Sequence, residues 1–225
     1  MKGSKEESNM QERKEYRYLD QLTERYPCLS AIRPELEKAY ETLRECYAKG
    51  GKLLAAGNGG SCADSEHIVG ELMKGFVKRR ELPEEMKAAL KQADPALGEE
   101  LSGCLQQALP AIALTGHAGL STAFANDVNA DMAYAQQVMG YGNEGDVFLG
   151  ITTSGNSLNV RYAAAAARAK GMKVISLTGR DGGKIRELSD ICLIVPEQET
   201  FKIQELHLPV YHALCLMLED CFFES

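Results

Sequence analysis

The sequence predicts an α/β protein in which helices cover both faces of a five-stranded parallel sheet. Five short, nearly continuous apolar runs have the length of buried strands. A helical pattern or a turn separates each run from the next, as in parallel sheets whose strands are buried on both faces. The expected strands are residues 52–56, 110–115, 146–152, 173–178 and 190–195.

Besides the helix that follows the first strand, four helices are expected around the sheet. The first ends before Pro27, and the second carries an apolar stripe at helical spacing and stops at Gly50 and Gly51. The third is rich in alanine and should pack closely, and the fourth is an apolar helix that closes the chain. Their expected ranges are residues 16–26, 32–48, 158–169 and 206–222.

An insertion interrupts the sheet pattern. Residues 1–29 are interpreted as an N-terminal tail with a helix, and 30–225 as a single domain with a helical hairpin at about 78–109. Pro83 and Asp94-Pro95 resemble helix starts. The basic triplet 78–80 is interpreted as a solvated helix end rather than a binding patch. The predicted apolar stripe of the second hairpin helix is Leu97, Leu101, Cys104, Leu105 and Ala108.

Bulk properties narrow the functional class. The 225 residues include 25 Lys and Arg against 32 Asp and Glu, a net charge of −7 that argues against a general nucleic-acid surface. No apolar run approaches the ~20 residues of a membrane span, and the polar N-terminus has no signal-peptide core. The seven cysteines include no Cys-x-x-Cys pair, which favours reduced thiols. We therefore expect a cytoplasmic protein with no nucleic-acid or membrane partner.

A glycine turn follows the first expected strand. Asn58, Gly59 and Gly60 allow a tight turn and close approach to a ligand, and Ser61 is a candidate N-cap for the next helix. His67 and Glu71 are four residues apart, so they share one face of that helix. This strand, turn and helix together indicate a small-molecule site.

A second polar turn follows the strand 146–152. Thr152, Thr153, Ser154 and Ser157 bring four hydroxyls to the carboxyl end of a strand and the start of a helix, where open parallel sheets bind ligands. Hydroxyls and free helix N–H groups suit a phosphate. Neither the lysine of a P-loop nor the third glycine of a dinucleotide fingerprint is present. Spacing alone leaves a phosphate-monoester site and a capping turn equally open.

The last helix carries three polar side chains. Gln204 and His212 are eight residues apart, so their directions differ by about 80° on an ideal helix. Pro209 lies between them and should bend or loosen the helix. His207 faces another way and is interpreted as a core histidine. A nitrogen and oxygen donor set suited to Zn²⁺ is formed by His67, Glu71, Gln204 and His212.

These motifs, in this order, resemble those of the phosphoheptose isomerases of the sugar isomerase (SIS) family. The resemblance also includes Asn126-Asp127, the turn 178–183 and Ile203-Gln204-Glu205, and it covers about residues 30–222 apart from the insertion. It implies a three-layer α/β/α sandwich with a five-stranded parallel sheet. It also implies a homotetramer with active sites shared between subunits, and one Zn²⁺ per subunit.

The resemblance implies isomerisation of sedoheptulose 7-phosphate to D-glycero-D-manno-heptose 7-phosphate through an enediol. Glu71 is then the carbon base and His212 the partner acid/base. The implied phosphate ligands are Thr152, Thr153, Ser154 and Ser157. The implied sugar contacts are Asn58, Gly59, Gly60, Asn126, Asp127 and Gln204. The implied metal ligands are His67, Glu71, Gln204 and His212.

Two other functions are weighed against this one. A non-catalytic SIS relative could be a scaffold that binds the replication initiator, or a regulator that senses a sugar phosphate. Such scaffolds lack the glutamate and the last histidine, whereas Glu71 and His212 are both present here. Phe201 stands where some relatives carry a polar substrate contact, which keeps isomerisation of another phosphosugar open.

Overall fold

The computed structural model describes residues 14–223, and the predicted tail lies mostly outside them. Five strands form one parallel sheet in the order β2-β1-β3-β4-β5. The predicted α/β class and the five-stranded parallel sheet are confirmed. Each strand lies within a residue or two of its expected range. The strands are β1 (Leu53–Gly57), β2 (Ala111–Ala113), β3 (Val147–Ile151), β4 (Lys173–Thr178) and β5 (Ile191–Ile194).

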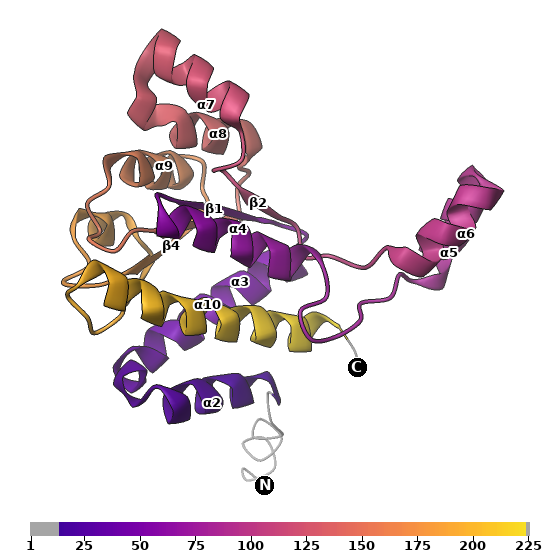
Figure 1. The fold of residues 1–225 in the computed structure, drawn as a ribbon, viewed down its shortest axis with the longest axis horizontal. Coiled ribbons are helices and arrows are strands. Elements are labelled where there is room, and N and C mark those ends of the chain that lie inside the picture. The colour runs from indigo at the N-terminus through magenta and orange to yellow at the C-terminus, as the bar shows by residue number, and fades with distance from the viewer. Residues whose placement is uncertain (1–13, 224–225) are drawn as a thin grey trace, which may run out of the picture.

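Alternate residues of the strands enter two separate apolar cores. Leu53 and Ala55 of β1 face a core shared with α3, α4 and α10, whereas Leu54 and Ala56 face a core built with α8 and α9. This alternation produces the three layers visible in Figure 1. The helices are α2 (Arg17–Arg25), α3 (Arg33–Ala48), α4 (Gly60–Met73), α7 (Ala118–Phe124), α8 (Ala133–Tyr141), α9 (Leu158–Ala169) and α10 (Thr200–Phe222). Short helical turns span Lys14–Tyr16, Pro27–Ile32, Ala125–Asn129, Ala130–Met132 and Lys184–Leu188.

The last helix is longer than predicted. α10 begins at Thr200, six residues before its expected start, and continues through Pro209. Proline removes one backbone hydrogen bond from a helix. The packing of α10 offsets that loss, because Ile203, Val210 and Met217 are among its buried residues on both sides of the proline. No helix among residues 14–223 is long and apolar enough to cross a bilayer.

The insertion is a helical hairpin that projects from the body of the protein (Figure 1). It consists of α5 (Glu84–Ala93) and α6 (Pro95–Cys104). Asp94 caps α6, since its Oδ1 accepts from the backbone N–H groups of Ala96 and Leu97 at 3.0 and 2.9 Å. Gly98 allows close packing, because a Cβ there would lie 2.3 Å from the carbonyl oxygen of Leu90.

The prediction of a packed apolar stripe on the second hairpin helix is wrong. Leu97, Leu101 and Leu105 are 60%, 38% and 47% exposed, and the helix ends at Cys104 rather than Ala108. The reason is geometric, because the hairpin stands away from the sheet and its two helices pack on each other. Helical periodicity therefore predicted that α6 is a helix, but not what its apolar residues pack against.

The basic triplet is also different from its prediction. Only Arg79 is solvated, with 71% of its side chain exposed. Lys78 pairs with Asp220 at 2.7 Å, and the Arg80 side chain is fully buried beside Glu219. Two acidic residues at the buried end of α10 account for this, because buried carboxylates need charged or hydrogen-bonding partners.

Candidate active site

The glycine turn after β1 opens α4. Gly59 has a φ of +58° and is the N-cap, so the prediction that Ser61 caps this helix is wrong. Ser61 is buried within the first turn instead. Asn58 and Asn159 exchange side-chain hydrogen bonds of 2.9 and 2.8 Å. This reciprocal pair joins the turn after β1 to the start of α9.

The loop of residues 152–157, here called the hydroxyl loop, lies between β3 and α9, beside the Asn58–Asn159 pair. Thr152 Oγ1 and Ser157 Oγ are 3.0 Å apart. Gly155 has a φ of +66°, and a Cβ there would lie 1.9 Å from the carbonyl oxygen of Gly182. The turn 178–183 therefore supports the hydroxyl loop, and Ile185 N–H donates to Gly155 O at 2.9 Å. The resulting surface offers hydroxyls at the N-terminus of α9, which suits an anion.

Three predicted reaction-centre residues converge between α4 and α10. Nε2 of His67 lies 3.1 Å from Oε1 of Glu71 and 3.5 Å from Nε2 of His212. The second oxygen of Glu71 lies 3.2 Å from Nζ of Lys74. Burial and the neighbouring His67 lower the pKa of His212, while the charge of Glu71 opposes that shift. His212 is therefore a neutral imidazole at pH 7.

Two further side chains hold this cluster, and sequence reasoning did not identify them. The hydroxyl of Tyr211 lies 3.0 Å from Nδ1 of His67 and 3.2 Å from Oδ1 of Asp64. Burial raises the pKa of both Tyr211 and Asp64. Asp64 precedes His67 by three residues on α4, a spacing that places them on one helix face and was the available signal.

Gln204 lies elsewhere. Its amide packs on Gly60, where a Cβ would be 2.4 Å from Nε2. Eight residues separate Gln204 from His212, about 12 Å along α10. Of the four predicted zinc donors, His67, Glu71 and His212 lie together, whereas Gln204 lies apart from them within one chain. The four predicted donors match zinc by chemical type, and zinc binding stays a prediction.

The two halves of the predicted site are separated within one chain. Glu71 follows Gly60 by eleven residues, about 16 Å along α4. Asn126 and Asp127 lie in the turn Ala125–Asn129, where both are exposed and share a 2.8 Å hydrogen bond. Among residues 14–223, no hydrogen bond links either of them to the glycine turn or the hydroxyl loop.

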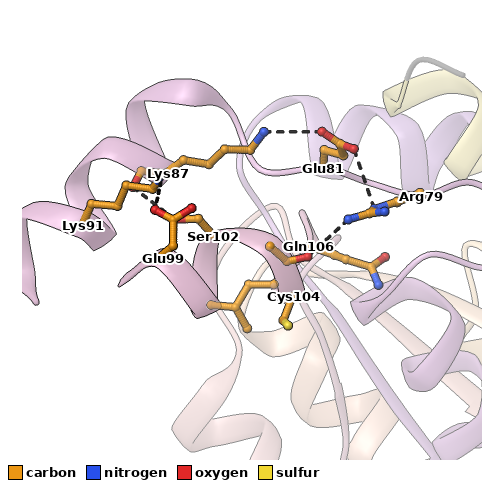
Figure 2. Close-up of a pocket in the computed structure, with 10 residues that line it drawn as sticks. Arg79, Glu81, Lys87, Lys91, Glu99, Ser102, Cys104 and Gln106 are labelled. Atoms are coloured by element: carbon orange, nitrogen blue, oxygen red, sulfur yellow. Dashed lines mark hydrogen bonds and ion pairs between the residues drawn. The ribbon is translucent and has the colours of Figure 1, made fainter. Parts of the chain in front are cut away.

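A hollow at the base of the hairpin is a weaker candidate. Figure 2 shows that charged side chains line it and pair with one another. Lys91 contacts Glu99 at 2.7 Å, and Lys87 contacts Glu81 at 3.4 Å. These charges are already paired with one another, which makes the hollow a weaker candidate than the cluster between α4 and α10.

Known proteins of one family resemble this chain in sequence and in fold. A SIS domain model matches residues 101–179. The phosphoheptose isomerase of Thiobacillus denitrificans is 40% identical over 188 residues, which are 82% of each chain, and that of Pelobacter propionicus is 39% identical over 80% of this chain and 82% of its own. The solved phosphoheptose isomerase of Francisella tularensis has a TM-score of 0.71 at 32% identity, covering 89% of this chain and 94% of its own. That of Neisseria gonorrhoeae has a TM-score of 0.67 at 34% identity, covering 92% and 93%.

The sheet, the hydroxyl loop and the SIS match define a phosphosugar isomerase. Within that class, the chain belongs to the phosphoheptose isomerase family.

Proposed function

We propose that the protein converts sedoheptulose 7-phosphate to D-glycero-D-manno-heptose 7-phosphate through an enediol. The observation that carries the proposal is the cluster of Glu71, His67 and His212 between α4 and α10. Ketose–aldose exchange needs one group that moves a proton between adjacent carbons and another that serves the oxygens. A carboxylate beside a neutral imidazole supplies both groups.

Each residue has a defined task in this reaction. Glu71 removes a proton from the carbon next to the ketose carbonyl and returns it to the former carbonyl carbon. His212 moves a proton between the two oxygens, because a neutral imidazole donates at one nitrogen and accepts at the other. His67 contacts both of them and is itself held at Nδ1 by the hydroxyl of Tyr211, so it orients the Glu71 carboxylate and the His212 ring relative to each other.

The hydroxyl loop is proposed to anchor the phosphate. Thr152, Thr153, Ser154 and Ser157 present hydroxyls there, and the N-terminus of α9 favours negative charge. Asn58, Gly59 and Gly60 are proposed to contact the sugar beside it. Anchoring the phosphate orients the substrate, which lowers the entropic part of the barrier.

The separation along α4 supports an oligomer with shared sites, proposed here as a homotetramer. Glu71 lies near the C-terminal end of α4, whereas the glycine turn lies at its N-terminal end, where Asn58 joins it to the start of α9. A second subunit could bring its own loop to the Glu71 cluster, and could also place Asn126, Asp127 and Gln204 at the sugar. Zinc binding stays a prediction, and no step above depends on it. A cytoplasmic location is proposed for such a biosynthetic step.

Turnover of pure compounds tests the proposal. The protein should convert sedoheptulose 7-phosphate to an aldoheptose phosphate, and a panel of other ketose phosphates should turn over more slowly. Faster turnover of another ketose phosphate would reassign the substrate. If no ketose phosphate reacts, with or without added zinc, the chain is a non-catalytic binder, and thermal shifts with the same panel would identify the ligand.

A further inference from the structure

We infer that Arg80 is a positioning residue that fixes the end of α4 carrying Glu71. The inference rests on the proposed function, in which Glu71 is the carbon base. Arg80 lies nine residues beyond Glu71, in the segment that leads into the hairpin, and only 1% of it is exposed. It touches none of the reacting groups with its own side chain, so it acts through the backbone.

The guanidinium group of Arg80 binds the last turn of α4. Nη2 donates to the carbonyl oxygen of Glu71 at 2.9 Å, and Nη1 donates to that of Leu72 at 2.6 Å. α4 ends at Met73, so both carbonyls belong to the last four of the helix, which have no partner within it. The residue after the helix, Lys74, is extended and provides no glycine cap. Arg80 thus caps this helix from the segment that follows it, and the backbone N–H of Leu109 also donates to the Leu72 carbonyl at 3.0 Å.

Glu219 of α10 fixes the guanidinium in turn. Nε of Arg80 donates to Oε1 of Glu219 at 2.9 Å, and Glu219 also accepts from the backbone N–H groups of Phe76 and Val77 at 2.8 and 2.9 Å. The ring of Phe223 lies 4.6 Å from Cζ of Arg80. These contacts join the end of α4 to α10, the helix that carries His212.

The contacts of Arg80 fix the position of the end of α4, which carries Glu71, relative to α10, which carries His212. Glu71 and His212 belong to different helices, and their distance depends on how the end of α4 sits on α10. A fully buried guanidinium with three directed hydrogen bonds sets that relation more narrowly than apolar contacts can. A displacement of about 1 Å at a catalytic group can reduce turnover by up to 10²-fold.

Arg80→Lys tests the inference, because lysine keeps the charge but cannot reach Glu219 and both carbonyls as a planar fork. We expect kcat for sedoheptulose 7-phosphate to fall at least about tenfold. KM should change less than about twofold, because the hydroxyl loop that is proposed to bind the phosphate is unchanged. Arg79→Lys is the matched control, because Arg79 is exposed. It should retain wild-type kcat and KM.

The outcomes separate the two claims. If wild type fails to turn over any phosphosugar, the proposed function fails and this inference with it. If wild type is active and folded Arg80→Lys keeps its kcat, or loses kcat only in proportion to its folded fraction, Arg80 is merely structural. Should Arg80→Lys not fold, Phe223→Leu decides, because it removes the ring beside the guanidinium and leaves its hydrogen bonds. It should lower kcat about twofold to fivefold at constant KM, and an unchanged kcat overturns the inference.

Discussion

Oε1 of Glu71 lies 3.1 Å from Nε2 of His67, one turn earlier on the same helix. Its other oxygen faces Lys74 at 3.2 Å, and the carboxyl side chain is 13% exposed. The carboxylate is therefore held from two sides yet reachable from solvent.

Glu71→Gln should abolish turnover while leaving the fold intact. General-base catalysis contributes about 10²–10⁴-fold, and an amide of the same shape cannot accept the carbon proton. We expect kcat to fall at least 10²-fold with little change in KM, measured by aldoheptose phosphate formation. Glu66→Gln is the matched control on α4, because Glu66 is exposed and bonds Thr115 rather than the cluster. Retention of wild-type kcat by Glu71→Gln would assign the base elsewhere.

Gly155→Ala should destabilise the protein through the hydroxyl loop. Gly155 combines a φ of +66° with a Cβ position 1.9 Å from the carbonyl oxygen of Gly182, so alanine must displace the supporting turn. We expect a loss of at least about 2 kcal/mol in the free energy of unfolding, measured by urea denaturation. Gly103→Ala, at an open position of α6, should change stability by less than about 1 kcal/mol.

Buried His207 should make stability depend on pH. As predicted, it is a core histidine with no exposed surface; Nε2 donates to the Thr178 carbonyl at 3.2 Å, and Nδ1 finds no partner among the described residues. Burial lowers its pKa from 6.5 to about 4. The unfolded chain therefore binds this proton below pH 6.5, and the folded chain only near pH 4. The free energy of unfolding should fall by about 3 kcal/mol as pH falls through that window.

His207→Gln isolates this contribution. Glutamine does not titrate and can donate to the same carbonyl, so the variant should lose less stability than wild type between pH 6.5 and pH 4. The comparison removes the shared effect of the carboxylates, which also titrate there. His117→Gln is the control, because His117 is exposed. Parallel stability curves for wild type and His207→Gln would show that His207 does not titrate in this window.

The sheet was predictable because its strands are short, nearly continuous apolar runs, a pattern that fits buried strands of a parallel sheet. Strand β4 matches its expected range at both ends, and helix α9 does so as well. The helices α7 and α8 were not predicted. Residues 118–141 mix small, polar and exposed side chains, and Val128 and Met139 face solvent. α8 buries Ala133, Gln137 and Val138, but one of these is small and one is polar, so the apolar periodicity is too weak to detect.

Residues far apart in sequence account for what the sequence could not reveal about the site. Arg80 looks like one of three surface charges until α10 places Glu219 against it, 139 residues later. Gln204 has the right chemistry for the metal set, but the helix positions it over Gly60. In both cases the deciding fact is which side chain lies opposite, and that depends on tertiary packing.

Mixed oligomers should show whether two chains build one site. Within one chain, the Glu71 cluster lies about 16 Å along α4 from the glycine turn. We expect Glu71→Gln to be inactive, and likewise Ser154→Ala combined with Ser157→Ala. Co-expressing the two with different tags and purifying through both tags should restore activity. An intact Glu71 from one chain would then meet an intact loop from the other.

Symmetry sets the size of the effect. If two-fold pairs of subunits share their sites and mix freely, about a quarter of all sites should regain both intact halves. Purification through both tags removes the unmixed oligomers, so in a tetramer the doubly tagged fraction should approach about two sevenths of wild-type kcat per site, with wild-type KM. Each homomer purified separately is the control for residual activity. A mixed oligomer as inactive as its parents would mean that Glu71 and the hydroxyl loop of the same chain serve one substrate.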